Sequence, residues 1–356
     1  MSGAPTQATA YRLFDRRIWS DVPLRLLPTA TGQEPLAPGT EPADIRVRWH
    51  YTPTRVDPKS PFVLGNHRTE ICCRSIESGY MFDYPSHGLR VKINKIGTEL
   101  DIHPWAPTNQ PTSGPTNSLD YSPELVQDSL VTAILTRLPS LWGYVAIHAA
   151  ALTTPHGLVL LMGDSGVGKS TISQYLARER GWTILDDDTN VLIPEASGIR
   201  IIPMGALARL RRDASDELDL SGSLPLGPRS TKIASSAATD EQLKSAPNHV
   251  AAAFYLATFP PAQSEEPRHS TRREIAIEPV EGPQSFVSAA RSSLRIDRTS
   301  RPWQLGLMRL AQTLSSSRAV AVTYSRPDTH PQDLASLIAS VVESTQTVKI
   351  RTLRPR

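Results

Sequence analysis

The residues best suited to chemistry form one glycine-rich segment near the middle of the chain. It reads Gly163-Asp164-Ser165-Gly166-Val167-Gly168-Lys169-Ser170 and is followed by Thr171. This is a complete match to G-x-x-x-x-G-K-[ST], in which backbone N–H groups and a helix N-terminus surround phosphate oxygens. Lys169 is expected to reach the outer phosphates, and the Ser170 hydroxyl to help hold Mg²⁺. The segment therefore predicts a site for a nucleoside triphosphate with Mg²⁺.

Three consecutive aspartates, Asp186, Asp187 and Asp188, follow the apolar run 182–185. A carboxylate at the end of a buried strand can hold Mg²⁺ directly or through water. A second carboxylate beside it could accept the proton of an attacking hydroxyl. Neighbouring residues on a strand point to opposite faces, so the choice of two among the three stays open.

Two further groups of residues carry charge or titrate near neutral pH. His148 lies on an apolar run just before the glycine-rich segment, where a histidine is more often a core residue than a reactive one. Arg209, Arg211 and Arg212 are followed at once by Asp213, which by charge alone describes a solvated helix face. Residue type alone assigns no role to either group.

The surrounding pattern predicts alternating strands and helices. Apolar runs at 144–152 and 157–162, separated by a turn at 154–157, precede a helix over 170–180 that Gly181 closes. A strand over 182–185 and a hairpin of 191–193 with 199–202 follow. Further predicted elements are strands at 251–257 and 274–277 and an amphipathic helix at 333–342. This order indicates an α/β core.

The N-terminal part of the chain favours short strands. Candidates are 24–27, 45–49 and 89–96, and the stretch 106–120 is rich in Pro, Thr, Ser, Asn and Gly. A helix is then expected to start at Ser122 and to stop at Pro139. We therefore predict a small, mostly-β domain over 1–105, a linker over 106–120 and a catalytic domain over 121–350.

Composition narrows the classes of partner. The 356 residues carry 38 basic and 35 acidic side chains, a net charge of +3, which is no electrostatic footprint for nucleic acid. No apolar run approaches the length of a membrane span, and the first residues lack the apolar region of a signal peptide. The two cysteines, Cys72 and Cys73, are adjacent and fit a reduced state. We expect a cytoplasmic protein with no nucleic-acid or membrane partner.

Two common classes of nucleotide-binding protein fit poorly. A GTPase needs N-K-x-D after the phosphate-binding loop, whereas Asn94-Lys95 precedes it and lacks the aspartate. A transporter ATPase needs L-S-G-G-Q and a strand ending in Asp-Glu. The sequence Leu220-Ser221-Gly222-Ser223 departs from that signature, and Asp240-Glu241 follows no apolar strand.

The centre of the chain resembles the catalytic domain of the HPr kinase/phosphorylase family. The resemblance rests on three segments in this order: His148-Ala149-Ala150-Ala151, residues 157–170, and Asp187-Asp188. That family has a phosphoenolpyruvate-carboxykinase-like fold with a P-loop. The resemblance implies an α/β core of this type behind the mostly-β N-terminal domain. A closer resemblance is to the relatives that modify peptides, including lasso-peptide tailoring kinases. It rests on the opening at 11–24 and on Arg209-Leu210-Arg211-Arg212-Asp213, where Arg211 and Arg212 replace the usual Trp and Pro.

The resemblance also implies roles for individual residues. Lys169 would contact the β- and γ-phosphates, Ser170 and Asp187 would serve Mg²⁺, and Asp188 would be the general base. His148 would sit beside that base, and the assignment could shift by one residue onto Asp186 and Asp187. Arg209 and Lys232 are further candidates for neutralising transition-state charge.

By this resemblance the chain is an ATP-dependent kinase that acts on a serine-type hydroxyl of a peptide or protein. A kinase of a small hydroxylated metabolite such as free serine, and a nucleotide-binding regulator without transfer activity, remain as alternatives. The residues do not decide between ATP and another phosphoryl donor or whether a reverse, phosphorolytic reaction exists. They also leave open a homo-oligomeric state.

Overall fold

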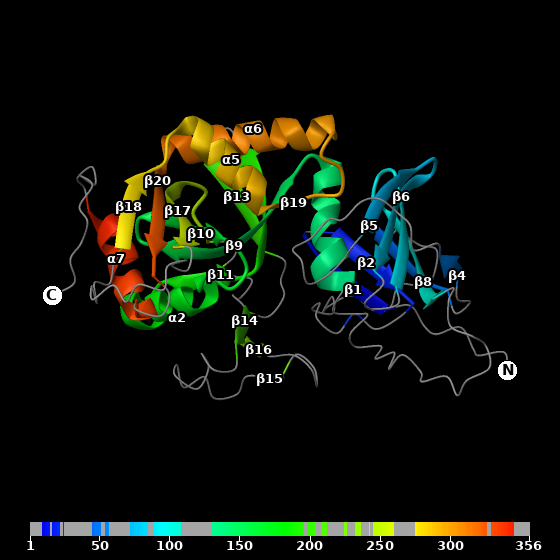
Figure 1. Cartoon of the computed structure of the whole chain (residues 1–356), viewed down its shortest axis with the longest axis horizontal. Helices are drawn as coiled ribbons and strands as arrows, with labels where there is room; N and C mark the ends of the chain where they lie inside the picture. The colour runs from blue at the N-terminus through cyan, green and yellow to red at the C-terminus, as the bar shows by residue number, and fades with distance from the viewer. Residues whose placement is uncertain are drawn as a thin grey trace, which may run out of the picture. The chain divides into compact units, whose positions relative to one another are not determined.

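The computed structural model describes the following residues: 9–14, 16–21, 24, 45–50, 54–56, 72–84, 89–107, 130–195, 198–203, 208–211, 224–225, 232–235, 242, 245–259, 275–325 and 329–344. The predicted strand at 24–27, the predicted linker and the predicted start at Ser122 lie mostly or wholly outside these residues. The fold is mixed α/β (Figure 1). Within the described segments, no helix combines the length and apolar character needed to cross a membrane.

The chain divides into two compact units. Unit 1 comprises 1–142 and 295–300, and unit 2 comprises 143–294 and 301–356. The division after Trp142 places residues 130–142 with the N-terminal unit, whereas the predicted catalytic domain over 121–350 includes them.

Unit 1 contains a mixed sheet with the strand order β1-β2-β3-β8-β7-β6-β5, and β4 pairs with β8. Strands predicted at 45–49 and 89–96 are present as β3 and β7. The strand bounds are β1 Thr9–Leu13, β2 Arg16–Ser20, β3 Ile45–Trp49, β4 Thr54–Val56, β5 Cys72–Ile76, β6 Gly79–Tyr84, β7 Leu89–Asn94 and β8 Glu99–Pro107.

The helical segment of unit 1 differs from its prediction at the C-terminal end. A π-helical stretch, η2 (Leu130–Ile134), continues into a 3₁₀ stretch, η3 (Leu135–Trp142), with Pro139 inside it. Proline removes a donor that a regular α-helix needs, but this segment is not regularly wound. Pro139 therefore lies within this irregular helix and does not stop it.

Unit 2 is built on a larger sheet with the order β13-β12-β9-β10-β17-β20-β18, and β11 and β19 also pair with β9. A separate small sheet has the order β14-β16-β15. The strand bounds are β9 Val145–Thr154, β10 Gly157–Gly163, β11 Thr183–Asp186, β12 Thr189–Glu195, β13 Gly198–Pro203, β14 Ala208–Arg211, β15 Leu224–Pro225, β16 Lys232–Ser235, β17 Val250–Thr258, β18 Ile275–Pro279, β19 Ser293–Leu294 and β20 Arg318–Tyr324.

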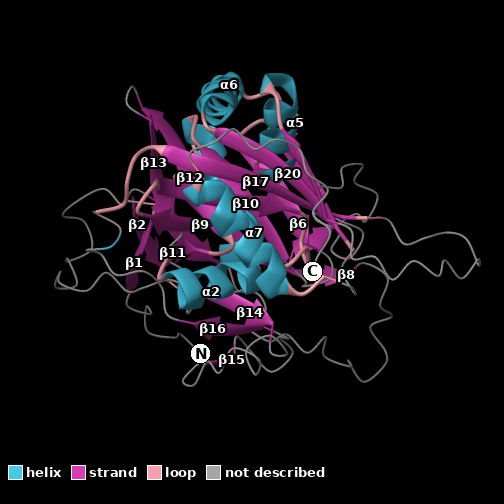
Figure 2. Ribbon diagram, turned by 90° about the vertical axis from the view of Figure 1, so that its left-hand side faces the viewer, coloured by secondary structure: helices cyan, strands magenta, loops and turns pink. Residues whose placement is uncertain are grey.

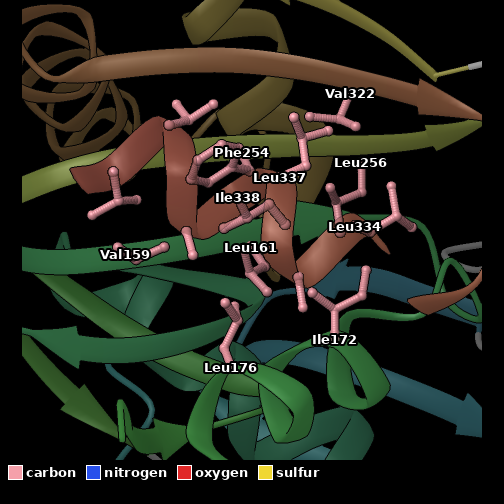
Figure 3. Packing of buried hydrophobic residues seen from close by; sticks show 14 of the residues in the cluster. Val159, Leu161, Ile172, Leu176, Phe254, Leu256, Val322, Leu334, Leu337 and Ile338 are labelled. Carbon is pink, nitrogen blue, oxygen red and sulfur yellow. The ribbon is translucent and has the colours of Figure 1, made fainter. Parts of the chain in front are cut away.

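Helices cover both faces of this sheet (Figure 2). The helix bounds are α2 Lys169–Arg180, α5 Gly282–Ser292, α6 Arg301–Ser316 and α7 Pro331–Glu343. On one face α2 and α7 pack against Leu161 and Phe254, among other buried side chains (Figure 3). On the other face Leu160 and Met162 pack against Leu307 and Leu310 of α6. Burial of apolar area on both faces holds the sheet rigid under the site.

Most of unit 2 was predicted from the sequence, but α5, α6, β19, β20 and the small sheet of β14, β15 and β16 were not. The helix face suggested by the charge pattern from Arg209 is wrong for 208–211, which form strand β14. The predicted helices at 170–180 and 333–342 correspond to α2 and α7, and Gly181 closes α2 with φ +66°. The predicted hairpin is formed by β12 and β13.

Candidate active site

The glycine-rich segment forms the turn between β10 and α2. Its glycines adopt conformations that other residues rarely adopt, with φ +147° at Gly163, +86° at Gly166 and +97° at Gly168. A Cβ atom at Gly163 would lie 2.4 Å from the carbonyl oxygen of Leu256. Strand, loop and helix thus follow in the order that the phosphate-binding pattern requires.

Lys169 is the first residue of α2, and its side chain folds back over the loop. The Nζ atom donates to the carbonyl oxygens of Gly163 at 2.8 Å and Asp164 at 3.1 Å. The residue is buried. Its ammonium group therefore lies against the loop that the pattern assigns to phosphates.

Strand β9 carries the loop on one side and the acidic segment on the other. Met162 of β10 pairs with Ala149, one residue before the loop begins. On the opposite side Asp186 pairs with Ala151, and Thr189 pairs with His148. Since adjacent strands lie 4.7–4.9 Å apart, we infer that the backbones of the two segments are about 10 Å apart.

The N–H group of Ala149 donates to the carbonyl oxygen of Asp188 at 3.1 Å, which fixes the acidic segment to this level of β9. The fully buried Asn190 adds a second tie, because its Nδ2 donates to the carbonyl oxygen of Ala149 at 2.8 Å. The acidic segment therefore has a defined position relative to the start of the loop. Sequence spacing gave no signal for Asn190.

Asp186 closes the acidic turn. Its Oδ1 accepts N–H bonds from Asp188 at 2.9 Å and Thr189 at 3.2 Å. Burial, and next the neighbouring Asp187 carboxylate, raise the pKa of Asp186 to about 8, although the two N–H donors oppose the shift. With its side chain committed to the turn, Asp186 is the least suitable of the three as a metal ligand or base. This favours the pair Asp187 and Asp188.

The side chain of His148 on β9 lies next to that of Asp188. The Nδ1 atom of His148 lies 3.4 Å from Oδ1 of Asp188, and the two side chains are 28% and 23% exposed. Both can be reached from solvent, whereas Asp187 is buried. A partly exposed carboxylate paired with an imidazole can accept a proton from an incoming hydroxyl.

Oxygen donors at this edge of the sheet fit a Mg²⁺ ion that arrives with a nucleotide. Among the described residues there is no group of three or more His, Cys, Asp or Glu that could hold a metal. Mg²⁺ bound to a nucleotide needs only one or two carboxylates, since phosphate oxygens and waters complete its octahedron. Asp187 and Ser170 offer ligands of that chemistry.

Arg209 and Lys232 lie on the small sheet. Arg209 of β14 is opposite Ala234, and Lys232 of β16 is opposite Arg211. Strand β14 packs near α2, the helix that follows the loop. The side chains of Arg209 and Lys232 lie outside the described ones, so their roles stay predictions.

No family model matches this chain. No curated protein matches it either. Among solved structures, the chain is similar to the HPr(Ser) kinase/phosphatase from Coxiella burnetii, with 16% identity over 55% of this chain and 87% of that chain. The TM-score of 0.25 is too low for this likeness to define the fold.

Proposed function

We propose that this protein is an ATP-dependent kinase that transfers the γ-phosphate to a serine-type hydroxyl of a peptide or protein. The observation that carries the proposal is the pairing of His148 on β9 with Asp188, which lies on the side of β9 opposite the glycine-rich loop. Phosphoryl transfer to a hydroxyl requires a phosphate-binding site and a proton acceptor. In this proposal the two parts lie on opposite sides of one strand.

Each residue has a defined task in this proposal. The loop N–H groups and Lys169 bind the phosphates and neutralise the charge that develops on them. Asp188 accepts the proton of the attacking hydroxyl, and His148 holds the Asp188 carboxylate in position. Arg209 and Lys232 add positive charge near the transferred group. When bound, Mg²⁺ would be held by Ser170 and Asp187 and would neutralise negative charge on the phosphates.

The proposal of a peptide or protein acceptor is supported by the resemblance of 11–24 and 209–213 to peptide-tailoring kinases. Phosphoryl transfer depends mainly on alignment and charge neutralisation, so the residues at the loop are equally suited to a small hydroxylated acceptor. The experiment must therefore offer both kinds of acceptor.

The test mixes the purified chain with ATP, Mg²⁺ and either serine-containing peptides or free serine, and follows ADP release and acceptor mass. We expect a peptide to gain one phosphoryl group. Lys169→Ala and Asp188→Asn should abolish the gain, while Glu278→Gln, an exposed carboxylate on β18, should not. Transfer to free serine alone would favour a metabolite kinase. ATP binding without any transfer would favour a regulator.

A further inference from the structure

A buried tyrosine at the end of a nearby strand contacts the middle of the phosphate-binding loop. Tyr324 is the last residue of β20, which is separated from β10 by β17. Its hydroxyl donates to the carbonyl oxygen of Val167. The residue is 3% exposed, and its own carbonyl oxygen accepts the N–H of Phe259 at 3.0 Å. The phenol is therefore held by a rigid part of the sheet.

This contact determines the direction of one loop peptide. In a trans peptide the carbonyl oxygen and the following N–H point in opposite directions. Holding the carbonyl of Val167 toward Tyr324 therefore directs the N–H of Gly168 the other way. The partially negative carbonyl oxygen of Val167 then points away from the side on which the N–H of Gly168 can donate to a ligand.

The residue at 168 must be small for this contact to form. A Cβ atom on Gly168 would lie 3.3 Å from the Tyr324 hydroxyl oxygen, which is tighter than ordinary packing, and φ at Gly168 is +97°. Glycine therefore satisfies two requirements there, namely the backbone conformation and the approach of the phenol.

We propose that Tyr324 is a positioning residue that presents the Val167–Gly168 peptide to the polyphosphate part of the nucleotide. This inference rests on the proposed function, because it assumes that the loop binds phosphates. Without the hydroxyl, the peptide loses its preferred orientation and the loop binds polyphosphate less tightly.

The test compares Tyr324→Phe with Tyr255→Phe by calorimetric titration of ATP and of tripolyphosphate. Tyr255 is a matched control, since its hydroxyl is also buried but the residue packs with the cluster on the α6 side of the sheet. We expect Tyr324→Phe to weaken both ligands by the same factor, about fivefold to tenfold, as for the loss of one hydrogen bond. Tyr255→Phe should change neither.

Melting of the ligand-free variants shows whether they are folded. Should Tyr324→Phe not fold, 3-fluorotyrosine at position 324 keeps the hydroxyl as a stronger donor and is expected to bind both ligands at least as tightly as the wild type. Three results would overturn the inference: unchanged affinities in Tyr324→Phe, weaker binding of ATP but not of tripolyphosphate in that variant, or weaker binding of both ligands in the fluorinated protein.

The two proposals fail in different ways. A wild-type chain that binds neither ligand contradicts both. A wild-type chain that binds both while Tyr324→Phe binds them equally well contradicts only the role of Tyr324. Binding that Tyr324→Phe weakens, without transfer to any hydroxyl, contradicts the kinase and supports the role of Tyr324.

Discussion

The imidazole Nδ1 of His148 lies 3.4 Å from Oδ1 of Asp188, although the two residues are distant in sequence. The antiparallel pairing of β9 with β12, in which His148 is opposite Thr189, brings them together. A change in either side chain should therefore affect the same chemical step.

We expect Asp188→Asn to lower the rate of phosphoryl transfer by about 10² to 10⁴, the range for removal of a general base. His148→Gln should lower it by about tenfold because His148 acts through Asp188. The double variant should be no slower than Asp188→Asn, since the pair acts as a unit. Single-turnover rates at saturating ATP check this, with ATP affinity as the control. Fully additive losses would show that the two side chains act independently.

Asp186 should make the folded state less stable as pH rises. Its pKa is raised from 3.8 to about 8 in the folded protein. Between these two pH values Asp186 is therefore protonated in the folded state and ionised in the unfolded state. The contribution is present below about pH 4 and is lost as pH rises toward 8, at up to about 1.4 kcal/mol per pH unit. Asp186→Asn keeps a neutral oxygen acceptor and should flatten this slope.

Denaturant unfolding of the metal-free protein in EDTA between pH 4 and 8 measures that slope. Asp186→Ala is the comparison, because it leaves the N–H groups of Asp188 and Thr189 without their acceptor. It should lose about 1–3 kcal/mol throughout the range. Equal slopes in the wild type and Asp186→Asn would show that Asp186 is ionised in the folded protein.

Gly163→Ala should disable the loop. The added Cβ would meet the Leu256 carbonyl at 2.4 Å, and φ is +147°, so the end of β10 must move. We expect ATP binding to be lost. Gly181→Ala is a matched control, since φ is +66° but nothing lies within 4 Å of the added atom. It should cost about 1 kcal/mol in stability and leave ATP affinity unchanged. Calorimetric titration of both variants tests the contrast.

Cys73 should be almost inert toward thiol reagents in the folded protein. Burial raises its pKa to about 12, so the reactive thiolate is scarce at pH 8. In a Cys72→Ser background, we expect colorimetric thiol titration to find no rapidly reacting group until denaturant is added. Rapid reaction of the native protein at pH 8 would show that unit 1 opens at β5, the strand that carries Cys73.

Local patterns predicted the parts of the fold whose residues are consecutive. The strand, loop and helix around 157–180 were predictable because one pattern spans them. The contact of Tyr324 with Val167 joins residues 157 positions apart, and β20 was not predicted although Val320, Val322 and Tyr324 favour a strand. No pattern in a single sequence predicts a contact between residues as far apart as Tyr324 and Val167.

Helix α6 was missed for a different reason. Gly306 weakens its helical signal, yet a Cβ there would lie 2.4 Å from the carbonyl oxygen of Gly143. Close packing therefore requires the residue that local propensity disfavours.

The role of Asp186 was also unpredictable, since three identical side chains differ only in the hydrogen bonds that the turn gives them.

The position of β9 between the loop and the acidic segment has a consequence for how this protein could diversify. In the proposed kinase, the spacing between phosphate donor and proton acceptor is fixed by the width of one strand, and not by the reach of flexible side chains. Surfaces that recognise the acceptor can therefore vary without altering that spacing. Relatives that modify different hydroxyl compounds would be expected to differ around this strand while keeping its register.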